Sequence, residues 1–379
     1  MRRKTRFVCV SDTHGYTPSE AGFKLPAGDV LIHAGDLTNN GSLKELRKTI
    51  DWISKADFEI KIIVGGNHDI TLDQSFYSEH GRSFHGRQLE STQQCLKLIT
   101  ESPSIVFLRH ETAVVRLTRA DGPNTIFKVF GSPYSQFKGN WAFGYDSEDA
   151  AGLWTQISLD TDIVVTHTPP HSHCDQKPNG TFAGCTELRK ALSLIRPHLA
   201  ICGHVHEGRG YERVRWRSLT GETEISTKFE SHDSVDRVTR GKLPSVGSRK
   251  QSLIDLTGNR DQRLDNEGFS HPHYRHDMTV KSLTMSSVLL GVGSDSPATV
   301  PEEASPQTPN SPSDQPCLSA PIHLDFDHDL QTLRRESCIV NAAVVATSWP
   351  HRGGKRFNAP IVVNLDLPVW QADHAVANG

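Results

Sequence analysis

Residues 7–15, FVCVSDTHG, join a short apolar run directly to an aspartate and a histidine. Four further segments repeat this arrangement, each ending an apolar run in residues that can bind metal. In α/β sheets, ligands bind beyond the carboxyl ends of the strands, so we expect these side chains to meet at one edge. The four segments are residues 31–36 (LIHAGD), 62–69 (IIVGGNHD), 163–167 (IVVTH) and 199–206 (LAICGHVH).

Between residues 6 and 210, short apolar runs alternate with helical segments, a pattern typical of an α/β fold with a buried sheet. Residues 42–45, SLKE, form a capping box and predict a helix that begins there. Further helices are expected at residues 88–100 and 186–195, the second ended by Pro197. The expected strands are residues 7–10, 30–32, 60–64, 126–130, 163–165 and 199–202.

The five ligand-bearing segments resemble the ordered signature of the calcineurin-like metallophosphoesterase superfamily: DxH, GD, GNH(D/E), a lone His and GHxH. The resemblance covers residues 6–210 and implies the fold class, which is an α/β, four-layer αββα sandwich of two mixed sheets flanked by helices. Three further stretches are similar to those of small metallophosphoesterase-domain-containing proteins. They are residues 131–134 (GSPY), 141–143 (WAF) and 166–170 (THTPP).

Carboxylates together with imidazoles suit Mn, Fe, Co, Ni or Zn, and two such ions about 3.5 to 4 Å apart can clamp an in-line phosphoryl displacement. One such residue alone would more often be a surface or capping residue, but their ordered recurrence favours two divalent metal ions. The resemblance implies that Asp36 bridges the two metals. It also implies that Asp12, His14 and His206 complete one metal site and Asn67, His167 and His204 the other.

The resemblance assigns two further residues to catalysis. His68 is expected to contact the phosphate and protonate the leaving oxygen, with Asp69 orienting its ring. A simpler alternative is that Asp69 caps the helix after the turn. Trp141 and Phe143 have two interpretations, a wall that stacks a nucleobase or core packing.

The resemblance implies a metallophosphoesterase, a hydrolase whose expected substrate, by analogy with the family, is a phosphodiester, with a cyclic nucleotide as one candidate. The resemblance implies attack by a hydroxide that bridges the metals, with His68 as general acid. A phosphomonoesterase or a protein phosphatase would use the same metals and is an alternative. A non-catalytic scaffold is a further alternative, although the presence of His68, His204 and His206 argues against it.

The chain divides by composition into three parts. Residues 6–211 are expected to form the main part of the phosphoesterase domain. Residues 212–335 form a long polar insertion, expected to be largely disordered because it can bury little apolar surface, and are a candidate site for a protein partner. Residues 336–371 contain two strand-like runs that we expect to complete the same domain. A separate hairpin is the alternative, although isolated hairpins are marginal in water.

Composition also narrows the expected partners and location. The net charge of -3 and the pI near 6.7 disfavour nucleic acid bound to a broad basic surface. The sequence lacks a run of 18 apolar residues, and its first residues lack the apolar core of a secretion signal. The seven cysteines form no CxxC pair. We therefore expect a cytoplasmic protein with a small phosphoester substrate and no membrane partner.

Overall fold

The structure is a computed structural model that describes most of the chain outside the predicted insertion. Most of residues 212–335 lies outside the described residues. The expectation that this stretch is largely disordered therefore concerns residues that the structure does not describe. Among the described residues, no helix is both long and apolar enough to cross a membrane. The described residues are 1–136, 139–217, 236–245, 248, 250–258, 262–266, 281–283, 334–348, 350–351 and 354–370.

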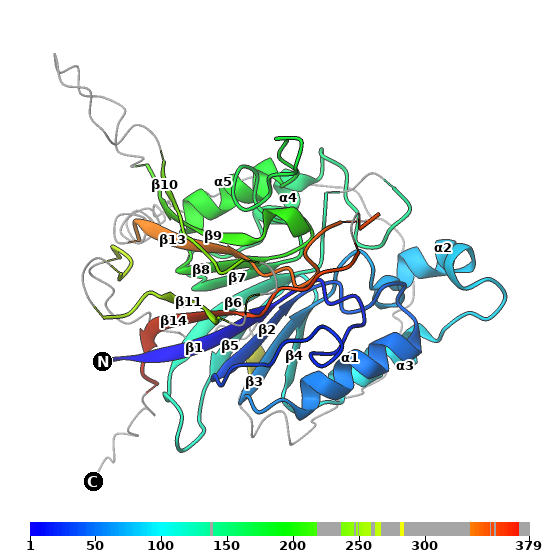
Figure 1. Ribbon diagram of the computed structural model, residues 1–379, viewed down its shortest axis with the longest axis horizontal. Coiled ribbons are helices and arrows are strands. Elements are labelled where there is room, and N and C mark those ends of the chain that lie inside the picture. The colour runs from blue at the N-terminus through cyan, green and yellow to red at the C-terminus, as the bar shows by residue number, and fades with distance from the viewer. Residues whose placement is uncertain are drawn as a thin grey trace, which may run out of the picture.

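The first sheet carries the segment that opens the chain. Its strands are β1 (Arg2–Val10), β2 (Val30–Ala34), β3 (Ile60–Val64), β4 (Ile105–Leu108), β11 (Ser252–Asp255) and β14 (Ile361–Pro368). Their order is β11-β14-β1-β2-β3-β4 (Figure 1). Strands β1 to β4 are parallel, and β14 is antiparallel to β1. Every residue of β2 and β3 is buried, as expected for parallel strands covered on both faces.

The second sheet carries the later ligand-bearing segments. Its strands are β5 (Glu111–Arg116), β6 (Ile126–Ser132), β7 (Ile163–Thr166), β8 (Leu199–Cys202), β9 (Gly210–Arg215), β10 (Arg237–Arg240), β12 (Lys281–Leu283) and β13 (Glu336–Asn341). Their order is β10-β9-β13-β8-β7-β6-β5-β12. Strands β6, β7, β8 and β13 are parallel, whereas β9 is antiparallel to β13. Both sheets are therefore mixed.

Local sequence explains where the helices begin. The helices are α1 (Leu43–Lys55), α2 (Gln74–His85), α3 (Thr92–Thr100), α4 (Ala150–Trp154) and α5 (Thr186–Ile195), with 3-10 turns at Ile70–Leu72 and His206–Gly208. The predicted capping box is present, because Ser42 accepts from the Glu45 amide and Glu45 reaches back to Ser42. Helix α3 begins later than predicted because Ser91 caps it.

The helices cover the outer faces of the sheets and give four layers (Figure 1). Leu46 and Ile53 of α1 belong to a buried cluster with Leu31 and Ile63 of the first sheet. Leu188 of α5 lies in a corresponding cluster on the second sheet. A third cluster fills the space between the sheets and includes Phe7, Ile32, Ile62, Val129, Val165, Ile201, Val340 and Val363. The predicted fold class, two mixed sheets flanked by helices, is confirmed.

The closing strands lie in different sheets. Strand β13 joins the second sheet beside β8, and β14 joins the first beside β1. Strand β9 extends past the expected boundary at residue 211. Within the predicted insertion, β10 pairs with β9 and β11 pairs with β14, so these described parts are ordered strands.

The chain between β13 and β14 joins the two sheets at one edge. Ala342 donates its amide hydrogen bond to Cys202 at the end of β8 (2.8 Å), and Val344 donates to Ser11 at the end of β1 (2.8 Å). Because β1 and β8 both end here, the segments that follow them, 12–14 and 203–206, face each other across this edge.

Candidate metal centre

One group of ligand atoms comes from the segments after β1 and β8. Nε2 of His14 lies 3.3 Å from Nε2 of His206. Nε2 of His206 also lies 3.4 Å from Oδ1 of Asp12. The three residues can offer donor atoms that all lie within 4.8 Å of one another, and all three are buried or nearly so. The structure thus brings together the three residues predicted for one metal.

A second group comes from the segments after β3, β7 and β8. Oδ1 of Asn67 lies 3.0 Å from Nε2 of His167 and 2.9 Å from Nδ1 of His204. Nδ1 of His167 faces the carbonyl oxygen of Ala34 at 2.9 Å, which leaves Nε2 as the nitrogen that faces the group. These are the three residues predicted for the other metal.

Asp36 lies between the two groups. Its Oδ2 is 3.7 Å from Nε2 of His14, and its Oδ1 is 3.4 Å from Nε2 of His167. One carboxylate oxygen therefore faces each group, which is an arrangement that lets one carboxylate bridge two ions.

The donor set fits transition metal ions. Two ligands about 2.1 Å from one ion, at tetrahedral to right angles, lie about 3.0 to 3.4 Å apart. The distances within each group, 3.3 and 3.4 Å in one and 2.9 and 3.0 Å in the other, agree with that spacing. Carboxylate, amide oxygen and imidazole together suit divalent Mn, Fe, Co, Ni or Zn.

Strained backbone conformations position several of these side chains. The φ angles are 53° at Asp12, 45° at His14, 53° at Asp36 and 65° at His204. Non-glycine residues rarely adopt this left-handed region, and each instance costs about 1 to 3 kcal/mol. The hydrogen bond from the His14 amide to the Asp36 carbonyl (3.0 Å) is one of the contacts that hold these turns.

Two glycines leave room for the ligands. A Cβ atom on Gly66 would collide with the amide nitrogen and the carboxylate of Asp36. A Cβ atom on Gly203 would collide with the carboxylate of Asp12. Both positions therefore require glycine because another segment of the site lies against their backbone.

Charge coupling in the site favours ionised carboxylates. Burial disfavours the charged form of Asp12, but the hydrogen bond and charge of His206 outweigh it and lower the pKa of Asp12 to about 2. Burial also opposes protonation of His167, yet Asp36 raises the pKa of His167 to about 9. Burial lowers the pKa of His14 and of His204 to about 3 each. Two anionic carboxylates that favour a nearby positive charge, with His14 and His204 neutral, form a ligand set suited to cations.

His68 lies at the edge of the first group. Its Nδ1 is 2.7 Å from the carbonyl oxygen of Asn39, which can only accept, so Nδ1 carries a proton. The amide of His68 donates to Oδ1 of Asp36 (2.9 Å). A ring nitrogen of His68 can approach donor atoms of His14 and Asp36 within 4.8 Å. With Nδ1 held by Asn39, Nε2 is the atom available for proton exchange.

The Asp69 carboxylate is held by the loops around it. Its carboxylate accepts hydrogen bonds from the amides of Leu37 (3.1 Å), Thr38 (2.9 Å) and Gly66 (2.9 Å), and from the Thr38 hydroxyl (2.8 Å). The Asn39 carbonyl, and not Asp69, holds the His68 ring. Nor does the Asp69 side chain cap the following 3-10 turn. Asp69 instead ties the turn after β2 to the turn after β3.

The contacts of the His68 ring were not predicted from the sequence. Trp141 packs on its ring, with centroids 4.1 Å apart, whereas Phe143 is buried in the outer core of the first sheet. No sequence signal identifies Asn39, because any residue supplies a carbonyl oxygen. The WAF stretch at residues 141–143 indicated that Trp141 is of interest. It did not indicate that Trp141 packs on His68.

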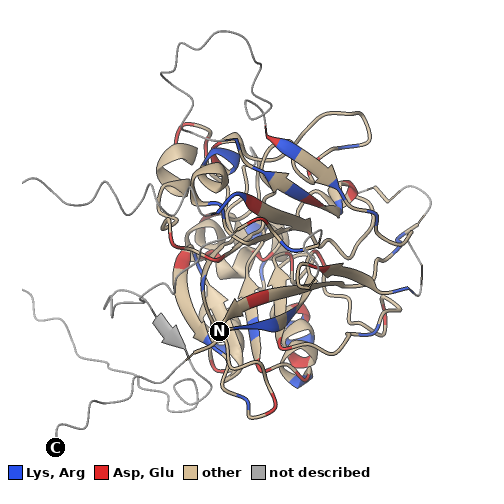
Figure 2. Cartoon of the chain, turned by 90° about the vertical axis from the view of Figure 1, so that its left-hand side faces the viewer, with Lys and Arg blue, Asp and Glu red and all other residues tan. Residues whose placement is uncertain are grey.

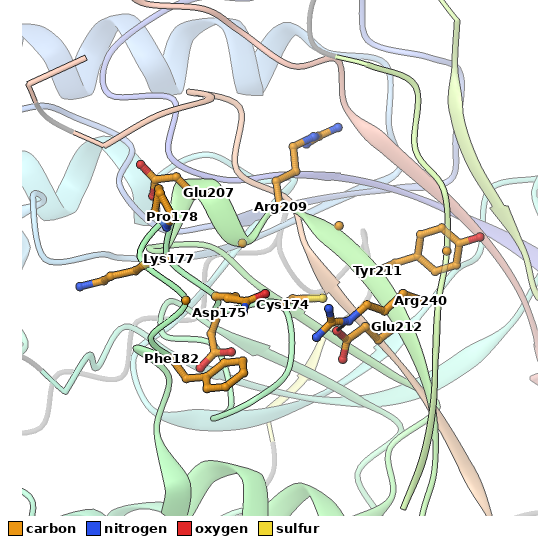
Figure 3. Close-up of a pocket in the computed structure, with 15 residues that line it drawn as sticks. Cys174, Asp175, Lys177, Pro178, Phe182, Glu207, Arg209, Tyr211, Glu212 and Arg240 are labelled. Atoms are coloured by element: carbon orange, nitrogen blue, oxygen red, sulfur yellow. Dashed lines mark hydrogen bonds and ion pairs between the residues drawn. The ribbon is translucent and has the colours of Figure 1, made fainter. Parts of the chain in front are cut away.

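A separate pocket of 610 Å³ lies between the loop that contains Cys174 and the start of β9 (Figure 3). Glu207, which follows His206, lines it, but among the described residues none of the predicted metal ligands does. Glu212 at this pocket is already paired with His173 (2.8 Å) and Arg240 (3.0 Å). Elsewhere, charged residues of both signs are scattered over the two halves of the molecule (Figure 2).

Comparison with known proteins gives the class of this protein. Residues 5–208 match the family model of the calcineurin-like phosphoesterases. The match covers more than half of the chain and spans all five ligand-bearing segments. The chain belongs to the calcineurin-like phosphoesterase family, as its sequence motifs indicated.

Three individual relatives match this chain over slightly more than half of its length. Metallophosphoesterase domain-containing protein 1 of Homo sapiens is 33% identical over 216 residues, 54% of this chain and 62% of that protein. A UPF0046 protein of Caenorhabditis elegans is 31% identical over 209 residues, 54% of this chain and 52% of that protein. A protein of Emericella nidulans named probable rhamnogalacturonate lyase C is 39% identical over 223 residues, 57% of this chain and 19% of that protein. The chain thus matches less than two thirds of the length of each relative.

Proposed function

We propose that this chain is a metal-dependent phosphodiesterase that acts on a small phosphodiester. The observation that carries the proposal is the place of Asp36, with one carboxylate oxygen 3.7 Å from His14 and the other 3.4 Å from His167. This arrangement supports a pair of ions that share one carboxylate. Membership in the phosphoesterase family supports the class of reaction.

The chain's own residues would hold two ions in two groups joined by Asp36. Asp12, His14 and His206 would hold one ion, and Asn67, His167 and His204 the other. When bound, such ions supply Lewis-acid activation of water and of the phosphoryl oxygens. The carbonyl of Ala34 would keep Nε2 of His167 directed at its ion through the bond to Nδ1.

His68 would provide the proton for the leaving oxygen. The Asn39 carbonyl fixes the orientation of its ring through Nδ1, so a second proton on Nε2 would be held toward the site. Transfer of that proton typically accelerates ester cleavage about 100 to 10,000-fold. This role needs no contribution from the Asp69 carboxylate, whose oxygens accept from the loop backbone and Thr38.

The charge of the site supports a diester over a monoester. A phosphomonoester dianion is commonly bound by an Arg fork. Arg209, close to His206 in sequence, donates instead to the carbonyl oxygens of Ala343 (2.9 Å) and Ala359 (2.6 Å). Its guanidinium is therefore committed to the backbone. A singly charged diester, with a cyclic nucleotide as one candidate, needs no such guanidinium.

The test compares two chromogenic esters that differ in charge. Purified full chain, stripped with chelator and reloaded with Mn²⁺, is assayed with bis(4-nitrophenyl) phosphate and 4-nitrophenyl phosphate. We expect metal-dependent turnover of the diester that Asp36→Asn and His68→Asn abolish or strongly reduce. His80→Ala, which removes an imidazole on α2, is the control and keeps full activity. Turnover of the monoester alone would replace the proposal by a phosphomonoesterase.

We extend the proposal to location and partners. The six described cysteines are all free and buried, which supports a reducing compartment such as the cytoplasm. A protein partner would engage the insertion at residues 212–335, most of which lies outside the described residues. Affinity capture with the full chain and with a chain lacking residues 284–330, which keeps β12, tests this, because only the full chain should retain the partner.

A further inference from the structure

The ring of His68 packs against the indole of Trp141. Their ring centroids lie 4.1 Å apart, with 38° between the ring planes. Phe84 of α2 contacts the same indole at 5.3 Å between centroids. Trp141 thus lies between α2 and the proposed general acid.

The backbone around Trp141 is tied to the metal centre. The amide of Ala142 donates to the carbonyl oxygen of Asn67, an expected metal ligand (3.3 Å). The amide of Phe143 donates to Oδ2 of Asp73, the N-cap of α2 (2.9 Å). Phe143 is buried and has a φ of 55°, an angle that only a fixed loop maintains. The position of the indole is therefore set by the same turn that carries His68.

Two other contacts restrain the His68 ring. Asn39 accepts from Nδ1 at 2.7 Å, and the His14 ring meets His68 edge-on, with centroids 4.7 Å apart and planes at 90°. A hydrogen bond at one nitrogen leaves the imidazole free to rock about that bond. The flat face of Trp141 limits this motion, and an indole face near an imidazolium also attracts its charge.

We propose that Trp141 is a positioning residue that holds His68 at the angle needed to protonate the leaving group. This inference rests on the proposed function, since it concerns the proton that His68 would deliver. It predicts that loss of Trp141 lowers kcat, and that kcat falls more for a leaving group that needs a proton more. Substrate affinity and metal binding should not depend on it.

The test compares two diesters that differ in the acidity of the leaving group. Phenolate is a poorer leaving group than 4-nitrophenolate and therefore needs proton transfer more. In the Mn²⁺-loaded full chain, we expect Trp141→Leu to lower kcat for diphenyl phosphate about 10 to 100-fold, as misplacement of a catalytic group by about 1 Å can do. The loss for bis(4-nitrophenyl) phosphate should be several times smaller, with KM unchanged for both. Trp141→Phe keeps an aromatic face and should restore most of the rate.

A tryptophan distant from the site is the control. Trp370 follows the end of β14 and lies against the Arg116 side chain. Trp370→Leu should leave both rates unchanged. A structural readout accompanies the kinetics: in the zinc-loaded chain, the His68 ring proton resonance should shift in Trp141→Leu as the ring current of the indole is removed.

The outcomes separate the two proposals. An equal loss on both diesters in Trp141→Leu, or an unchanged His68 resonance, would overturn the positioning role and leave the phosphodiesterase proposal intact. Absence of turnover of any diester by the wild-type chain would overturn both proposals, and in that case the resonance shift would report only a structural contact.

Discussion

Oδ1 of Asp36 lies 3.4 Å from Nε2 of His167, and the two residues come from different sheets. Asp36 follows β2 of the first sheet, and His167 follows β7 of the second. The candidate metal centre therefore lies where the carboxyl ends of both sheets meet, and its geometry depends on the packing of one sheet on the other.

The shared carboxylate should be essential for both ions. We predict that Asp36→Asn lowers bound metal from about two ions per chain to fewer than one, because a neutral amide replaces the carboxylate whose two oxygens face His14 and His167. Metal analysis after gel filtration measures this. Asp51→Asn, on the exposed side of α1, should retain the wild-type metal content. An unchanged metal content in Asp36→Asn would mean that Asp36 is not the shared ligand.

The close approach at Gly66 should be intolerant of any side chain. A methyl group there would meet the Asp36 amide and carboxylate, so Gly66→Ala should lower stability by about 1 to 3 kcal/mol and also reduce metal binding. Urea unfolding of the metal-free chain measures the first effect. Gly152→Ala in α4 is the matched control, because its Cβ would meet nothing within 4 Å and alanine favours the helix. Equal stability of the two variants would contradict this account.

Asp69 should act through the loops and not through the His68 ring. In Asp69→Asn, an amide NH2 group replaces one carboxylate oxygen. That group cannot accept the hydrogen bonds that backbone N–H groups donate to the carboxylate in the wild type. We expect a loss of about 1 to 3 kcal/mol in stability. Urea unfolding of the variant and the wild type compares this directly. A variant of wild-type stability that had lost its diesterase activity would instead support the orienting role expected from the sequence.

A buried ion pair at the end of the insertion should stabilise the second sheet. Arg334 donates to Oδ1 of Asp162 at 2.8 Å, and both side chains are at most 3% exposed. Removing only the cation in Arg334→Ala should lower the free energy of unfolding by about 1 to 3 kcal/mol, because the buried Asp162 loses a charge-assisted hydrogen bond. The double variant Arg334→Ala with Asp162→Ala should lose less than the sum of the two single variants. Additive losses in urea unfolding would show that the two residues are not coupled.

Much of the fold was predictable because its strands are buried on both faces. The runs 60–64 and 199–202 were predicted with the bounds that the structure has, since a continuous apolar run ends where the site begins. Helix α2 was not predicted, because its sequence has only three apolar residues, Phe76, Tyr77 and Phe84, and only Tyr77 and Gly81 are buried. Strand β5 was also not predicted, because polar residues at its two ends, Glu111, Thr112 and Arg116, leave only a short apolar run.

The site was predictable where it depends on side-chain type. Each expected ligand is an Asp, Asn or His directly after an apolar run, and the structure brings all seven together. The environment of His68 was not predictable, because it depends on a backbone carbonyl at Asn39 and on Trp141, which a distant loop supplies. The sequence also did not predict that the Asp69 carboxylate accepts from the amides of Leu37, Thr38 and Gly66.

Anomalous diffraction from crystals of the full chain grown with Mn²⁺ tests the two-metal centre most directly. We expect two peaks about 3.5 to 4 Å apart, one beside Asp12, His14 and His206 and the other beside Asn67, His167 and His204, with Asp36 between them. A single peak, or peaks away from these residues, would contradict the account.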